Sequence, residues 1–175
     1  MNTENNILPT WNLEDLYGSA DSKELLDDFS TLEISANKFI NTYQNSIANI
    51  SSENFSEAIL LYENLKEKME KISSFAELLY NEDLLNKKNS RFAQSVREKI
   101  SSIVGKLIFF TLEINNLPEK TLQEHYKNET LKRYRPWIET IRLFKNYQLS
   151  KEIEKVFEEK KITSSNAWRR LYDEI

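Results

Sequence analysis

Glycine and proline, the residues that most often interrupt regular structure, are scarce in this sequence. Its 175 residues include two glycines, Gly18 and Gly105, and three prolines, whereas average usage would give roughly a dozen glycines. Tight hairpin turns need residues with positive φ, most often glycine, so the shortage argues against a multi-stranded antiparallel sheet. A glycine-rich phosphate-binding loop is excluded as well, because two isolated glycines cannot form one.

Cysteine is absent, and His125 is the single histidine. The chain therefore has no disulfide framework and no thiol nucleophile. A catalytic zinc site normally takes three protein ligands from His, Cys and carboxylates, and a Ser-His-Asp triad needs a histidine beside its serine. His125 has no second histidine four residues away, so we expect a surface or partly packed side chain. No catalytic, metal-binding or cofactor-binding residue is predicted in this chain.

Charges of both signs are interleaved along the sequence, with 24 Lys and Arg against 28 Asp and Glu and a net charge of -4. Such mixing, as in residues 63–71, is typical of solvated helix faces, whereas a nucleic-acid binder usually shows a basic face. The longest apolar stretch, residues 103–114, is too short for a membrane span, which needs about 20 apolar residues. Because the sequence also starts without a secretory signal, we expect a cytoplasmic protein without nucleic-acid or membrane partners.

Apolar residues recur at three- and four-residue steps, the spacing of amphipathic helices, through three long segments. After an irregular lead over residues 1–21, we predict long antiparallel helices over residues 22–48, 53–83 and 89–115. The third helix should be the most central, since Ile108-Phe109-Phe110 is apolar on more than one face. Gly105 lies within it and costs about 1 kcal/mol relative to alanine; a close helix crossing would explain it.

Shorter helices are predicted in the last third of the chain. Pro118 fits the first turn of one helix, and a new helix should begin at Pro136. Ser150 is the expected N-cap of the next helix, and Thr163 or Ser164 that of the final one. The expected fold class is therefore all-α, an antiparallel bundle of long helices followed by shorter helices.

Three segments, one near the start and two near the end of the sequence, carry a recognisable pattern. Residues 11–17 read Trp-Asn-Leu-Glu-Asp-Leu-Tyr, residues 147–150 read Tyr-Gln-Leu-Ser, and residues 167–174 read Ala-Trp-Arg-Arg-Leu-Tyr-Asp-Glu. In this order they resemble the N-terminal region of oligoendopeptidase F enzymes, which are zinc peptidases of the thimet-oligopeptidase superfamily. By this resemblance, residues 1–175 form the N-terminal helical lobe of a larger helical peptidase.

The resemblance implies a peptidase whose deep channel admits oligopeptides and excludes folded proteins. In the family, two histidines of a His-Glu-x-x-His helix and a further Glu bind Zn²⁺, and the Glu of the motif acts as general base on the metal-bound water. This sequence lacks that motif, so the catalytic domain is expected outside it. The chain would form part of the channel wall and cover and be inactive alone. The alternative is a stand-alone helical interaction or scaffold protein without enzymatic activity.

The last predicted helix carries Trp168 and Leu171 on one side and reaches Ile175 without a cap or a polar tail. From this we expect a truncated chain whose missing partner is the catalytic domain. A large apolar face left uncovered marks an interaction surface. Trp168 should then be exposed, whereas in a self-sufficient module it would fold back onto the face of Trp137 and Phe144.

Overall fold

The computed structural model describes the backbone of residues 11–174, and this part of the chain is built from helices without any strand. The long helices are α1 (Lys23–Tyr43), α2 (Ser52–Glu82) and α3 (Lys87–Asn116). The shorter ones are α4 (Glu119–His125), α5 (Glu129–Arg142), α6 (Lys151–Lys160) and α7 (Ser165–Glu174), with single turns η1 (Ile47–Asn49), η2 (Lys145–Tyr147) and η3 (Lys161–Thr163) at the connections. The predicted all-α fold class is confirmed.

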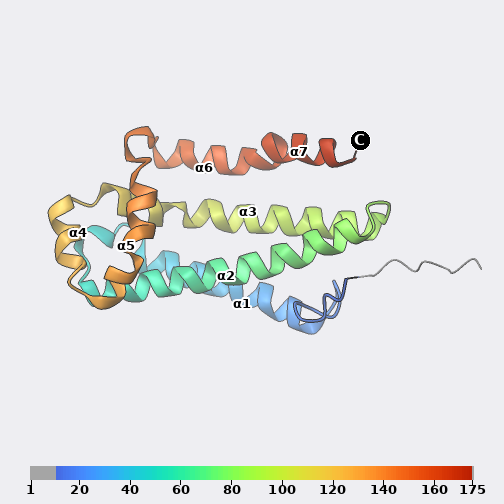
Figure 1. Ribbon diagram of the computed structural model, residues 1–175, viewed down its shortest axis with the longest axis horizontal. Coiled ribbons are helices and arrows are strands. Elements are labelled where there is room, and N and C mark those ends of the chain that lie inside the picture. The colour runs from blue at the N-terminus through green and yellow to red at the C-terminus, as the bar shows by residue number, and fades with distance from the viewer. Residues whose placement is uncertain (1–10, 175) are drawn as a thin grey trace, which may run out of the picture.

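The long helices lie side by side, α4 and α5 close one end of the bundle, and α6 and α7 run back along α3 (Figure 1). Side-chain caps fix where the helices begin. The hydroxyl of Ser22 accepts the backbone N–H of Leu25, and that of Ser51 accepts the N–H of Asn54. These caps provide partners for N–H groups that a first helical turn leaves unpaired. Both α2 and α3 begin and end within two residues of the prediction.

The first long helix is shorter than predicted, because it ends at Tyr43 rather than at residue 48. Asn45 has a positive φ of 66°, which a right-handed helix cannot contain. Glu113 of α3 stabilises the turn that follows α1. Its carboxylate accepts the backbone N–H of Asn45 at 2.8 Å and that of Ile47 at 3.3 Å.

The core lies between the three long helices and is rich in aromatic rings. The ring centroids of Phe39 and Phe110 lie 5.1 Å apart in an edge-on arrangement, and those of Tyr62 and Phe110 lie 4.9 Å apart. Such tilted and edge-on pairs are the favoured geometry of aromatic side chains. Because α3 contacts α1, α2, α5 and α6, its predicted central position is confirmed.

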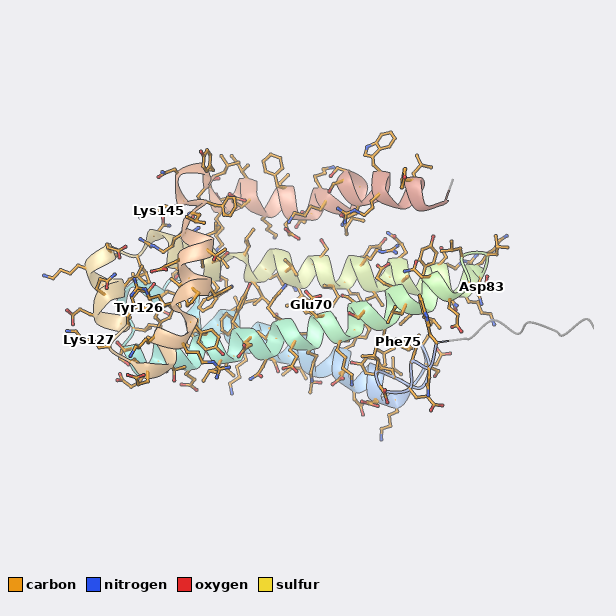
Figure 2. All side chains as sticks on the ribbon, in the orientation of Figure 1. Glu70, Phe75, Asp83, Tyr126, Lys127 and Lys145 are labelled. Carbon is orange, nitrogen blue, oxygen red and sulfur yellow. The ribbon has the colours of Figure 1, made fainter. Side chains whose placement is uncertain are left out.

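Tyr17 attaches the start of the described chain to the bundle. Its buried ring packs edge-on against Phe75, which is labelled in Figure 2, with 5.3 Å between centroids. Its hydroxyl donates to Asp28 at 2.7 Å, and burial and this hydrogen bond raise the pKa of Tyr17. Residues 11–21 form turns rather than a helix; the rest of the predicted lead, residues 1–10, lies outside the described residues.

The prediction of a new helix at Pro136 is wrong, because α5 begins at Glu129 and Pro136 lies within it. The side-chain oxygen of Asn128 accepts the N–H of Thr130 at 3.0 Å and caps the helix upstream. Proline deprives the carbonyl of Lys132 of its helical donor. Both Lys132 and Pro136 are exposed, so water can satisfy that carbonyl and the helix continues.

Gly105 is buried on the side of α3 that faces α6. A Cβ atom at this position would meet Cγ of Lys155 at 3.8 Å and no backbone atom within 4 Å. This is ordinary van der Waals contact. Gly105 therefore lies where α6 packs against α3, but a side-chain stem covers it and the packing does not require glycine.

Candidate interaction surface

His125, the single histidine, would be needed for a Ser-His-Asp triad and is the only histidine available to a zinc site. In the structure its side chain belongs to the core. It lies at the end of α4 and is 5% exposed, so the prediction of a surface or partly packed side chain is wrong. Its Nδ1 lies 2.9 Å from the hydroxyl oxygen of Ser52, and its ring lies 5.0 Å from that of Phe55. Burial lowers the pKa of His125, against a smaller opposing effect of the Glu53 carboxylate.

Two further features are absent from residues 11–174. No group of three His, Asp or Glu side chains is placed to hold a metal ion. No single helix in this range is long and apolar enough to cross a membrane; α3 and α4 meet the length and composition criteria only as a pair, and the chain bends by 101° between them.

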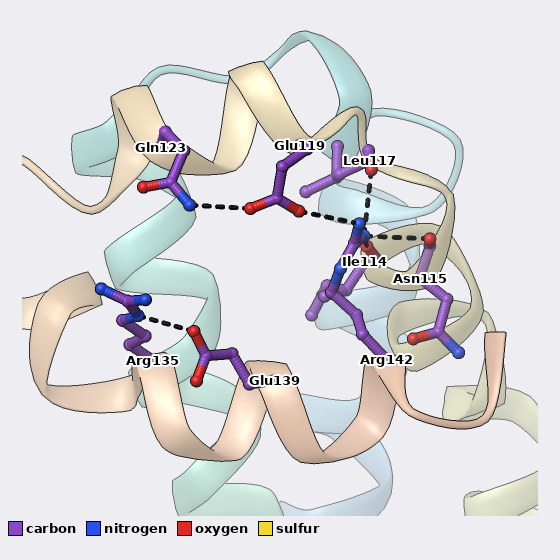
Figure 3. A network of polar contacts seen from close by, with 8 residues as sticks. All are labelled: Ile114, Asn115, Leu117, Glu119, Gln123, Arg135, Glu139 and Arg142. Carbon is purple, nitrogen blue, oxygen red and sulfur yellow. Dashed lines mark hydrogen bonds and ion pairs between the residues drawn. The ribbon is translucent and has the colours of Figure 1, made fainter.

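Arg142 fixes the corner from which the last helices depart (Figure 3). Its Nη1 atom donates to the carbonyl oxygens of Ile114, Asn115 and Leu117 at 3.0, 3.0 and 2.9 Å, and its Nη2 atom lies 3.5 Å from the carboxylate of Glu119. The carbonyls at the end of a helix have no helical donor. One guanidinium therefore satisfies the end of α3 and joins α5 to it.

Beyond this corner, α6 turns its apolar stripe away from the bundle. The cap predicted at Ser150 is present, since its hydroxyl accepts the N–H of Ile153. Amphipathic helices normally bury their apolar side. Here Ile153, Val156 and Phe157 are exposed, whereas the more polar side, with the half-buried Glu154, faces α3.

The apolar stripe of α6 continues into η2 and α7 and forms what we call the outer apolar face. Side chains project from the far side of α6 and α7, and Lys145 marks the turn that leads to them (Figure 2). Trp168 is 72% exposed. It does not fold back onto Trp137, so its predicted exposure is confirmed. The exposed members of the face are Leu143, Phe144, Tyr147, Leu149, Ile153, Val156, Phe157, Trp168, Leu171 and Tyr172.

Two ion pairs lie along α6 and the turn that follows it. Lys155 lies 3.8 Å from Glu159, and Lys161 forms an ion pair with Glu158. Exposed pairs of this kind contribute little to stability. The outer apolar face itself consists of apolar and aromatic side chains, which is the composition of an interface centre.

The comparisons with known proteins concern this part of the chain. A protein-family model described as oligopeptidase F matches residues 113–175. The match starts in the last turn of α3 and includes the Arg142 corner and the outer apolar face, whereas the motif at residues 11–17 lies outside it. Searches of curated proteins and of solved structures found no match. This match confirms the predicted resemblance for residues 113–175, which are similar to the N-terminal region of oligopeptidase F.

Proposed function

We propose that this chain is the N-terminal lobe of a zinc-dependent metalloendopeptidase that hydrolyses oligopeptides, and that it forms part of the channel wall and cover. The family match over residues 113–175 is the observation that carries the proposal. Zn²⁺ and the general base would come from a catalytic domain outside these 175 residues. The described residues offer no ligand group for that ion, so no step of hydrolysis is assigned to them.

The outer apolar face is the proposed docking surface for the catalytic domain. An amphipathic helix that directs its apolar stripe away from its own bundle needs a second body to cover that stripe. Full burial of an aromatic side chain such as Trp168 would stabilise the assembly by roughly 2–3 kcal/mol. The Arg142 corner would hold α6 and α7 in position for this contact.

The gene beyond codon 175 tests the proposal most directly. We expect an open frame that continues to a His-Glu-x-x-His motif. A catalytic segment expressed from that continuation should bind this chain and gain activity toward a fluorogenic oligopeptide. A stop directly after codon 175 would favour the stand-alone scaffold protein instead.

A pair of matched substitutions locates the docking surface. Leu171 and Leu26 are both exposed, on α7 and α1 respectively. We expect Leu171→Glu to weaken reconstitution at least tenfold, because it places a charge within an apolar interface, and Leu26→Glu to leave it unchanged. Equal effects of the two substitutions would count against docking through the outer apolar face.

We further propose a cytoplasmic location for the enzyme, supported by the absence of cysteine, which fits a reducing compartment. Fractionation of cells that express the full gene tests this, and recovery in a secreted or membrane fraction would contradict it.

A further inference from the structure

A pocket with a volume of about 370 Å³ lies where α3, α5, η2 and α6 meet. Ile108 and Leu112 of α3 and Ile141 of α5 contribute apolar walls, and Phe144 and Tyr147 contribute aromatic ones. Pockets of this size with mostly apolar walls and a few polar groups are the usual form of small-ligand sites.

Two of the polar side chains in this pocket have an oxygen atom without a hydrogen-bond partner among the described residues. Asn115 is 6% exposed, and its Oδ1 atom is buried without a donor; Oε1 of Gln148 is also buried without one. Figure 3 shows the side-chain amide of Asn115 directed away from the guanidinium group of Arg142, which binds the backbone carbonyl of Asn115. Buried side-chain oxygens are nearly always hydrogen-bonded. The pocket therefore brings together two acceptors that need donors.

The single formal charge among the lining residues is negative. It is carried by Glu154, whose Oε1 atom accepts the backbone N–H of Leu149 at 2.9 Å and whose Oε2 atom has no partner among residues 11–174. Thr111, the lining hydroxyl on α3, donates to the carbonyl of Ile108 at 3.1 Å. A protonated amine has three N–H donors, and aromatic rings such as Phe144 attract cations. An amine therefore matches this set of groups, whereas a carboxylate would be repelled by Glu154.

We propose that this pocket binds the protonated α-amino group of a short peptide, with the apolar side chain of the first peptide residue against Ile108 and Ile141. The choice of a peptide as ligand rests on the proposed function, which supplies short peptides. The preference for an amine rests on the pocket itself, chiefly on Asn115, Gln148 and Glu154. Two of these residues lie in segments already singled out: Gln148 belongs to the Tyr-Gln-Leu-Ser segment, and Asn115 to the corner held by Arg142.

Nuclear magnetic resonance of the ¹⁵N-labelled 175-residue chain tests the proposal. Leucinamide carries an α-amine and an apolar side chain; at pH 6.5 its amine is mostly protonated, since α-amines have pKa values near 8. We expect saturable shifts of the side-chain NH₂ signals of Asn115 and Gln148. N-acetyl-leucinamide, which lacks the amine, should bind at least tenfold more weakly. N-acetyl-lysinamide, which offers only a side-chain amine, should also bind more weakly than leucinamide.

Matched variants place the binding in this pocket. Glu154→Gln should weaken leucinamide binding at least tenfold, whereas Glu159→Gln, the same change on the same helix outside the pocket, should leave it unchanged. Gln148→Leu removes one acceptor without altering charge and should also weaken it. Circular dichroism of each variant checks that the helices are intact.

Three results would overturn the proposal. Leucinamide and N-acetyl-leucinamide could bind equally, which would make the pocket merely apolar. N-acetyl-lysinamide could bind more tightly than leucinamide, which would assign the pocket to a lysine side chain. The third result is that no ligand shifts the Asn115 and Gln148 signals. None of these results alters the gene continuation or the reconstitution assay, so failure of this inference is distinguishable from failure of the proposed function.

Discussion

The Nδ1 atom of His125 lies 2.9 Å from the hydroxyl oxygen of Ser52, and this contact joins the end of α4 to the first turn of α2. The other ring nitrogen, Nε2, is buried without a partner among the described residues. A neutral ring suits this site. A protonated ring would place in the core a charge whose Nε2–H has no acceptor among the described residues.

The burial of His125 predicts a stability that depends on pH. The fold lowers the pKa of His125 below its ordinary value of 6.5. Below about pH 6.5 the unfolded chain therefore binds a proton that the folded chain resists, and the free energy of unfolding falls as pH falls. Urea denaturation between pH 7.5 and 5.5 measures this slope. His125→Gln, which stays neutral, should flatten it, and an unchanged slope in that variant would assign the dependence to other groups.

Arg142 should be among the most sensitive polar residues for folding. Arg142→Met leaves the carbonyls of Asn115 and Leu117 without their donor, while that of Ile114 keeps the N–H of Leu117. We therefore expect a loss of about 2–3 kcal/mol in the free energy of unfolding. Arg135→Met is the matched control in the same helix. It removes an exposed pair with Glu139 and a contact 5.3 Å from the ring of Tyr126, but no donor to a backbone carbonyl, and should cost about 1 kcal/mol or less. Chemical denaturation measures both, and equal costs would contradict the role given to Arg142.

Gly105→Ala should stabilise the chain by roughly 0.5–1 kcal/mol, since alanine is the better helix former. A Cβ atom at this position meets only Lys155, at 3.8 Å. Thermal denaturation should show a higher melting temperature. A lower melting temperature would mean that α6 lies closer to α3 than the distance of 3.8 Å between a Cβ atom at position 105 and Cγ of Lys155 indicates.

The outer apolar face predicts self-association of the chain in the absence of its partner domain. Analytical ultracentrifugation should show a weight-average mass that rises with concentration. Trp168→Ser should reduce this rise. Trp11→Ser, which changes another exposed tryptophan outside the outer apolar face, should not. A chain that stays monomeric at high concentration would count against an uncovered interface.

The chain alone should bind no Zn²⁺ stoichiometrically and should not hydrolyse peptides. One histidine and no cysteine leave too few ligands for a zinc site of the usual kind. Metal analysis after dialysis and a fluorogenic-peptide assay check this. One tightly held Zn²⁺ per chain, or turnover that survives repurification, would refute it.

Local signals in the sequence were sufficient to predict most of the fold. Ser22, Ser51 and Ser150 sit directly before amphipathic patterns and cap their helices, the last of them as predicted. The predictions failed where a distant residue decides the local structure. The corner at Asn45 depends on Glu113, 68 residues away. The continuation of α5 through Pro136 depends on which side of that helix faces water.

Of the candidate sites, too, some features could be predicted from local sequence and others depend on distant residues. The exposure of Trp168 follows from an apolar stripe visible in the sequence. The direction of the α6 stripe does not, because periodicity shows that a helix has an apolar side but not what that side faces. The pocket with Asn115 and Gln148 could not be predicted, since it exists only where four separate elements meet.

The carboxylate of Glu113 has a consequence for synthesis on the ribosome. The N–H groups of Asn45 and Ile47 find their acceptor in a residue made 68 and 66 positions later. Helices form from local contacts and can appear early, whereas contacts between distant residues must first close a long loop. The helices α1 and α2 can therefore form while the nascent chain emerges. The N–H groups of Asn45 and Ile47, in the connection between these helices, lack their acceptor until the end of α3 has left the exit tunnel.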